Sequence, residues 1–215
     1  MDFKELTIVI VTYKSEDKIF DCLNSIPEEI HVLVVENSND KNFKTKIEKS
    51  YKNVSCILSG KNSGYSVANN IGLNRVKTKY ALVLNPDAIL SLSSIKNFFI
   101  SADKVEDFWL MGPANDQMVK LNFENKNLIE VDNLKGFAIF FNMSKHKNDF
   151  FDENYFLFFE EIDLCKKVKN KKDKIYLDKN IFIKHEGASS VSKKNIFELE
   201  KNRNWHWMWS TFYFH

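Results

Sequence analysis

The first half of the chain alternates short apolar runs with segments of helical periodicity. The apolar runs at 6–11, 30–35, 54–58 and 80–84 are almost uninterrupted and rich in β-branched residues. This pattern is typical of parallel strands that are buried on both faces. Apolar residues recur at helical spacing between 15 and 26, before Pro27 ends the pattern. Repeated strand, helix, strand units predict a Rossmann-like α/β fold, in which helices flank a mostly parallel central sheet.

The second half has a different pattern. Apolar runs at 108–111, 118–123 and 136–141 are separated by longer polar connections, so we expect the sheet to gain mixed or antiparallel strands there. A last apolar run at 181–183 leads into His185 and predicts a final strand. No linker-like segment separates the two halves.

Composition narrows the class of protein. With 44% hydrophobic and 28% charged residues among 215, the chain has the composition of a globular domain. It contains no apolar run of membrane-spanning length and no signal-peptide pattern, so we expect a cytoplasmic protein. The 31 basic residues nearly balance the 29 acidic ones, and we therefore expect no nucleic-acid partner.

Polar residues follow three of the predicted strands. Thr12 and Tyr13 follow the first, Glu36 and Asn37 end the second, and the tripeptide 85–87 follows the fourth. Open α/β sheets bind ligands at the carboxyl ends of their strands, and these positions predict a nucleotide site. Asp87 is a candidate ligand for a divalent cation, because such ions prefer oxygen donors. The alternative is that Asn85-Pro86-Asp87 is an ordinary turn.

Two further segments carry candidate chemistry. The glycine-containing segment 60–72 could bring backbone amides close to a phosphate, although it is neither a P-loop nor a dinucleotide fingerprint. Glu161 lies in an acidic and aromatic cluster at 150–165. Residues 164, 165 and 168 would share its helix face, so Glu161 is expected to point inward and to suit a general base. His185 is either a ligand or a hydrogen-bonded structural residue.

Taken together, these motifs resemble family 2 glycosyltransferases of the GT-A fold, and in particular their rhamnosyltransferase-like branch. The resemblance covers about residues 6 to 192. It depends on four patterns that occur in order: Ile10-Val11-Thr12-Tyr13, Val34-Val35-Glu36-Asn37-Ser38, Asn62-Ser63-Gly64 through Asn69-Asn70-Ile71-Gly72 to Leu84-Asn85-Pro86-Asp87, and Phe151-Asp152-Glu153 through Phe158-Phe159-Glu160-Glu161-Ile162-Asp163-Leu164.

The resemblance implies transfer of a sugar from a nucleoside diphosphate sugar to an acceptor hydroxyl, with inversion and with Mg²⁺ or Mn²⁺ as cofactor. The acceptor would be a saccharide or a lipid-linked saccharide in cell-surface glycan synthesis. Asp87 would hold the metal together with His185, and Glu161 stands at the base position, where the family usually has aspartate. Donor-binding positions would be Thr12, Tyr13, Glu36, Asn37, Asn62, Gly64, Asn69 and Asn85.

The resemblance also suggests how one domain over 1–215 is organised: a nucleotide-binding half at 1–90, an acceptor and catalytic half at 91–192, and an aromatic tail at 193–215. The tail is too aromatic to remain in water. It packs on the domain or on a second subunit, or it lies at the inner face of the membrane.

Three other functions fit the sequence less well. A non-catalytic GT-A domain could bind a nucleotide sugar or a partner glycosyltransferase, because fold does not guarantee function. A glycosidase would also use paired carboxylates, but it has no need of a nucleotide cleft. A nucleotidyltransferase would need a glycine-rich triphosphate loop after the first strand, and none is present there.

Overall fold

The computed structural model describes residues 2–105, 107–114, 126–146, 150–185 and 196–215, with the side chains of the last segment described from 201 onward. The predicted strand at 118–123 lies outside these residues. In chain order the elements are η1 (Phe3–Glu5), β1 (Leu6–Thr12), α1 (Glu16–Asn24), β2 (His31–Glu36), α2 (Lys41–Ser50), β3 (Val54–Leu58), α3 (Gly64–Leu73), β4 (Tyr80–Leu84), β5 (Ala88–Ile89), α4 (Leu92–Lys104), β6 (Leu110–Pro113), β7 (Leu128–Glu130), β8 (Ala138–Asn142), α5 (Glu160–Asn170), β9 (Ile175–Asp178), β10 (Lys184–His185) and α6 (Ile196–Phe214).

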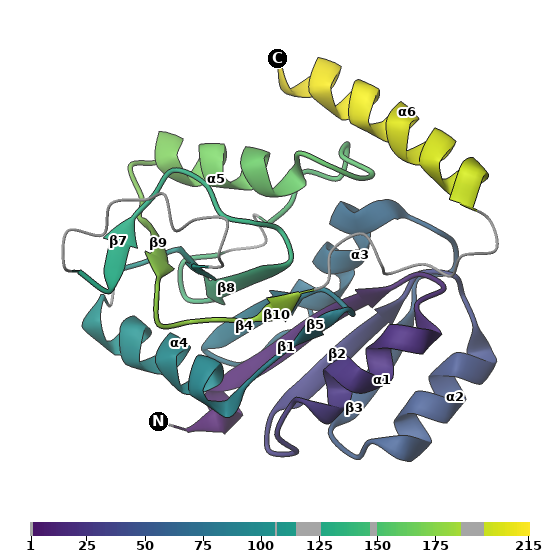
Figure 1. Ribbon diagram of the computed structural model, residues 1–215, viewed down its shortest axis with the longest axis horizontal. Coiled ribbons are helices and arrows are strands. Elements are labelled where there is room, and N and C mark those ends of the chain that lie inside the picture. The colour runs from purple at the N-terminus through teal and green to yellow at the C-terminus, as the bar shows by residue number, and fades with distance from the viewer. Residues whose placement is uncertain (1, 106, 115–125, 147–149, 186–195) are drawn as a thin grey trace.

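Eight of the strands form one central sheet in the order β3-β2-β1-β4-β8-β6-β9-β7 (Figure 1). The four strands β1 to β4 pair in parallel, as predicted. Strand β8 is antiparallel to both β4 and β6, and β7 is antiparallel to β9. The prediction of a parallel sheet that becomes mixed in the second half is therefore confirmed.

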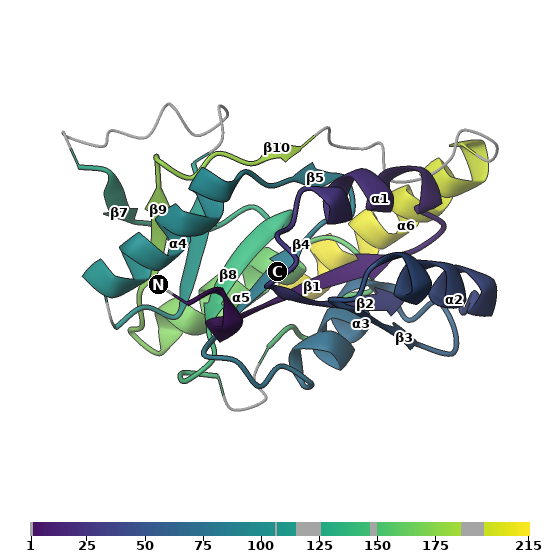
Figure 2. The same cartoon turned by 90° about the horizontal axis from the view of Figure 1, so that it is seen from below.

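The helices cover both faces of this sheet. Successive strand residues point to opposite faces, so Ile8 and Ile10 join one hydrophobic cluster while Val9 joins the other. Helices α1, α2 and α4 contribute to the first cluster, and α3 and α5 contribute to the second (Figure 2). Two-sided burial explains why the strand sequences are almost continuously apolar.

The predicted strand at 181–185 is shorter than expected. Only Lys184 and His185 are in a strand, and they pair antiparallel with β5 in a separate two-stranded sheet. Ile181 and Ile183 are fully buried, which explains their apolar character without strand pairing. The proposed boundaries near 90 and 192 stay predictions, although the central sheet includes strands from both sides of residue 90.

Candidate active site

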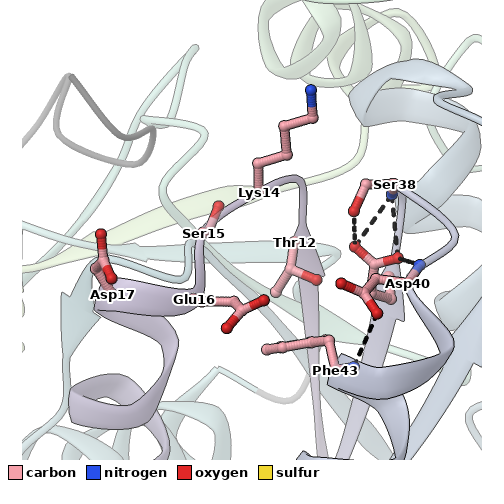
Figure 3. A pocket seen from close by; sticks show the side chains of 9 residues that line it. Thr12, Lys14, Ser15, Glu16, Asp17, Ser38, Asp40 and Phe43 are labelled. Carbon is pink, nitrogen blue, oxygen red and sulfur yellow. Dashed lines mark hydrogen bonds between the residues drawn. The ribbon is translucent and has the colours of Figure 1, made fainter. Parts of the chain in front are cut away.

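A pocket of about 280 Å³ opens at the carboxyl ends of β1 and β2 (Figure 3). The register aligns Thr12 with Glu36, so both strands end at the same edge of the sheet. Four carboxylates and one lysine are among its nine lining residues: Thr12, Lys14, Ser15, Glu16, Asp17, Glu36, Ser38, Asp40 and Phe43. Thr12 is buried, and its hydroxyl has no hydrogen-bond partner among the described residues. This pocket therefore offers acceptor groups to a ligand that carries N–H and O–H donors.

The carboxylate of Glu36 is engaged within its own loop. It accepts hydrogen bonds from the backbone amide of Ser38 at 3.1 Å and from that of Asp40 at 2.6 Å, and also from the Ser38 hydroxyl. Asp40 in turn caps α2 by accepting from the amides of Asn42 and Phe43. Glu36 thus shapes the pocket wall. Its predicted contact with the donor would add to these bonds or compete with them.

Asn37 connects the end of β2 to the start of α3. Its Nδ2 donates to the side-chain oxygen of Asn62 and to the Gly64 carbonyl, each at 3.1 Å. Its Oδ1 accepts from the amide and the hydroxyl of Ser63. These four bonds use the full capacity of an asparagine side chain. Direct donor binding by Asn37 stays a prediction, and it would require one of the bonds to open.

The backbone at the start of α3 requires a glycine at position 64. Its φ of +83° is in the left-handed region, and an added β-carbon would lie 2.6 Å from the carbonyl oxygen of Phe156. Gly60 has a similar φ of +85° but nothing within 4 Å of the same position. Substitution of Gly60 therefore measures the free-energy cost of the left-handed backbone alone. Substitution of Gly64 measures that cost together with the cost of the clash with Phe156.

We expect Gly64→Ala to destabilise the fold clearly more than Gly60→Ala. Both variants lose roughly 1 kcal/mol through the unfavourable φ, and Gly64→Ala adds an overpacking cost of about 1–3 kcal/mol. Urea unfolding of both variants measures the difference. Equal losses would show that the contact with Phe156 imposes no constraint.

Asn69 and Tyr13 flank the pocket region less directly. Asn69 is fully buried in α3, donates to the Tyr65 carbonyl at 3.0 Å, and leaves its Oδ1 without a described partner. Tyr13 follows β1, with the Lys14 ammonium 5.4 Å from its ring centroid. Their predicted roles in donor binding stay predictions.

A second group of site residues gathers around Asp87. Pairing of β5 with β10 sets His185 opposite Ala88, and this brings the imidazole Nε2 to 3.2 Å from the Asp87 carboxylate. Asn85 lies close by, with its Nδ2 3.4 Å from the same nitrogen. Burial acts to raise the pKa of Asp87, but the hydrogen bond and charge of His185, together with a backbone hydrogen bond and the charge of Lys18, leave the pKa below its ordinary value. Asn85, Asp87 and His185, all predicted site residues, therefore lie close together although His185 is about a hundred positions further along the chain.

The Asp87–His185 pair fits a divalent cation as two of its ligands. Asp87 offers a buried carboxylate oxygen and His185 an imidazole nitrogen 3.2 Å from it, and both are donor types that a divalent cation would accept. Within the described residues no cluster of three or more histidine, cysteine or acidic side chains could hold a metal. The remaining ligands would have to come from a bound diphosphate and from water.

The two acids at the start of α5 form the third group. Glu160 is buried, with its Oε2 lacking a described partner, and Glu161 follows it directly. A β-carbon added at Gly136 would lie 3.4 Å from the carboxyl carbon of Glu161. Burial raises the pKa of Glu161, and burial together with the charge of Glu161 raises the pKa of Glu160 to about 8. The inward orientation predicted for Glu161 agrees with this arrangement.

We expect Glu160→Gln to stabilise the protein at about pH 9 and to change little at about pH 4. The folded state holds a proton on Glu160 that the unfolded chain releases above its ordinary pKa of 4.5, so wild-type stability falls as the pH rises from there through about 8. Thermal unfolding of both proteins across this range measures the effect. A difference in melting temperature between the two proteins that is the same at every pH would contradict this expectation.

Two residues that were not predicted from the sequence, Tyr65 and Gly136, complete this group. The hydroxyl of Tyr65 donates to the Gly136 carbonyl at 2.8 Å, and burial, with the nearby Glu160 and Glu161, keeps the pKa of Tyr65 well above its ordinary value. Gly136 lies next to the side chain of Glu161, at a distance where an added β-carbon would make ordinary van der Waals contact with it. Tyr65 lies inside a recognised motif, but its long-range bond to Gly136 has no signature in the sequence.

The Glycosyl transferase family 2 model matches residues 7–194. The chain belongs to this family. A hexosyltransferase of low-salt glycan biosynthesis, Agl10 of Haloferax volcanii, is 25% identical over 194 residues, covering 78% of the chain and 62% of the relative. A teichoic acid poly(glycerol phosphate) polymerase of Staphylococcus epidermidis is 34% identical over 99 residues, covering 42% and 14%. The chain thus spans about three fifths of the first relative and one seventh of the second.

Solved structures share the fold. The mannosyltransferase PcManGT of Pyrobaculum calidifontis, in complex with GDP-Man and Mn²⁺, aligns with a TM-score of 0.73 at 12% identity, covering 94% of this chain and 61% of that one. S. aureus TarS in complex with UDP aligns with a TM-score of 0.64 at 18% identity, covering 80% and 57%. These neighbours confirm the predicted GT-A fold. The rhamnosyltransferase-like branch stays a prediction.

Proposed function

We propose that this chain transfers a sugar from a nucleoside diphosphate sugar to an acceptor hydroxyl, with inversion at the anomeric carbon, in the synthesis of a cell-surface glycan. The observation that carries the proposal is the dipeptide Gly136-Phe137. Glu161 packs over Gly136, while the Phe137 ring stacks on His185 with centroids 4.5 Å apart. A candidate base and a candidate metal pair therefore lie beside two adjacent residues, close enough to act on one bound donor and acceptor.

The residues divide the chemistry between them. The pocket lined by Thr12, Glu36 and Asp40 receives the nucleoside, whose base and ribose carry donors for its acceptor groups. Glu161 takes the proton from the acceptor hydroxyl as that oxygen bonds to the anomeric carbon and the bond from this carbon to the diphosphate breaks. Asp87 and His185 would hold the divalent cation, which when bound supplies positive charge to the departing diphosphate. Three similar proteins support this assignment. Agl10 is a hexosyltransferase, TarS was solved with UDP, and PcManGT was solved with GDP-Man and Mn²⁺.

A panel of nucleoside diphosphate sugars, each with and without Mg²⁺ or Mn²⁺, tests the proposal. A donor should raise the melting temperature only with a cation present, by mass action on the folded state, and should support transfer to a saccharide or lipid-linked saccharide. Metal-dependent binding without turnover across the panel would favour the non-catalytic alternative. If a donor raises the melting temperature equally with and without the cation, Asp87 and His185 do not hold a metal that takes part in donor binding.

The exposed face of α6 suggests a membrane contact. Trp205, Met208, Trp209 and Phe212 follow a helical stripe and are 46% to 79% exposed. Within the described part of the chain, no helix is long and apolar enough to cross a bilayer. We propose that this stripe lies in the headgroup region of a membrane that carries the acceptor, with the exposed Lys201 on the same side of the helix.

Sedimentation with vesicles containing phosphatidylglycerol tests this contact. We expect wild-type protein to sediment with the vesicles and the double variant Trp209→Ser, Phe212→Ser to remain in the supernatant. Concentration-dependent dimerisation that the same double variant abolishes, without vesicle binding by the wild type, would show instead that a second copy covers the stripe. A cytoplasmic location stays a prediction.

A further inference from the structure

The opposite face of α6 packs on the segment that leads into α5. The His206 ring stacks on Phe156 with centroids 4.2 Å apart, and the hydroxyl of Ser210 donates to the Leu157 carbonyl at 2.9 Å. Ser210 is fully buried by this contact, although α6 is otherwise largely exposed. We call residues 155–159 the bracing loop. This loop is held by α6 on one side.

The start of α3 holds the bracing loop on its other side. The backbone amide of Tyr65 donates to the Phe156 carbonyl at 2.7 Å, and Gly64 leaves no room for a β-carbon beside it. Tyr65 also bonds to the Gly136 carbonyl, beside which Glu161 lies. The loop is therefore in contact with the same structure that borders the two acids.

The last two residues of the bracing loop have an unfavourable backbone. Phe158 and Phe159 both adopt left-handed conformations, with φ of 72° and 68°, and α5 begins at the next residue, Glu160. Aromatic residues rarely adopt this conformation, and such strain persists only where the surroundings hold it in place. These two residues determine where and in which direction the helix carrying Glu160 and Glu161 starts.

Aromatic side chains of α6 supply contacts that hold this strained pair. The Trp207 ring lies 5.4 Å from that of Phe158 and 5.2 Å from that of Phe159, measured between centroids. Phe214 lies 5.5 Å from Phe159, and the Arg203 guanidinium lies 5.7 Å from the Phe158 ring centroid. Without these contacts the pair would be free to relax toward the ordinary helical or extended regions.

We infer that α6 is a positioning element for the transfer reaction, in which Trp207 and Ser210 hold the bracing loop so that Glu160 and Glu161 face the site. The inference rests on the proposed function, because Glu161 is its general base. The nucleoside pocket is lined by residues between 12 and 43 from other elements. Loss of the brace should therefore reduce turnover and leave donor recognition nearly intact.

The test compares Trp207→Ala, Trp207→Phe and Ser210→Ala in the full chain, with Thr211→Ala as the matched control. The Thr211 hydroxyl donates to the Trp207 carbonyl within α6 itself, so its loss should not release the bracing loop. We expect Trp207→Ala to lower kcat roughly 10- to 100-fold, as small displacements of catalytic groups do. Donor KM should change less than kcat, because the bracing loop contacts Gly64, a predicted donor-binding position, while the residues that line the nucleoside pocket lie between 12 and 43. Ser210→Ala should show a smaller loss, and Trp207→Phe should restore most of the activity.

Hydrogen exchange provides a readout that does not depend on activity. The amide of Asp163 donates to the Phe159 carbonyl at 2.8 Å, and that of Tyr65 donates to Phe156. Both amides should exchange faster in Trp207→Ala than in Thr211→Ala. If the wild type shows no turnover, the proposed function is refuted. The exchange measurement still tests whether α6 holds the bracing loop. Unchanged exchange, or equal losses of kcat in Trp207→Ala and Thr211→Ala, would overturn the inference.

Discussion

Glu161→Gln should reduce sugar transfer by roughly 10²-fold or more, the usual scale of general-base catalysis. The amide keeps the shape of the side chain over Gly136 but cannot accept the proton of the acceptor hydroxyl. Donor affinity should survive, because the nucleoside pocket and the metal pair involve other residues. Steady-state transfer assays, with donor binding followed in parallel by calorimetry, separate the two effects.

Two further variants make this test specific. Glu161→Asp restores the family's usual residue and should retain measurable turnover. Asp163→Asn changes an acid on the same helix that forms an ion pair with Lys167 at 2.9 Å, and it should have little effect on kcat. Near-normal turnover by Glu161→Gln would remove Glu161 as the base and would direct attention to the adjacent Glu160.

Asp87→Asn should reduce the affinity for a nucleoside diphosphate in Mn²⁺ to the value measured without metal. The amide preserves the size of a buried side chain, but it replaces a carboxylate oxygen with a neutral group that binds a hard cation poorly. Calorimetric titration of the diphosphate with and without Mn²⁺ measures the change. The circular dichroism spectrum should match that of wild type.

The matched control is Asp103→Asn, which changes an exposed carboxylate in α4 and should leave the metal dependence intact. His185→Ala should weaken metal-dependent binding less than Asp87→Asn, because a neutral imidazole contributes less to a divalent cation than a carboxylate does. Undiminished metal dependence in Asp87→Asn would exclude the Asp87–His185 pair as the metal site.

The sequence predicted the parallel half of the sheet well because those strands carry their own signal. Burial on both faces requires apolar residues at successive positions, and the runs at 54–58 and 80–84 match β3 and β4 residue for residue. The run at 181–183 had the same appearance, but only Ile181 and Ile183 are buried, Phe182 is exposed, and none of the three joins a strand. Apolarity reports burial, and only the tertiary fold decides whether buried backbone pairs with a neighbour.

The site residues stay predictions, but their positions in the fold can be compared with what the sequence indicated. Strand-end placement identified Thr12, Glu36 and Asp87, because the edge of a parallel sheet gathers such residues. It could not show that Glu36 and Asn37 are engaged in bonds within the protein. It also could not show that β10 pairs with β5, because two-residue strands carry no periodicity. The bracing loop has no local signal at all, since its left-handed phenylalanines depend on rings contributed by α6.

The pairing of β5 with β10 also affects the order in which parts of the protein fold. The nucleoside pocket uses residues between 12 and 43, so its closure involves short loops that form early. The contact between Asn85 and His185 spans 100 positions, and closing so long a loop is slow and must wait until that part of the chain has been synthesised. During folding, the pocket at the ends of β1 and β2 should therefore form before the contact between Asp87 and His185.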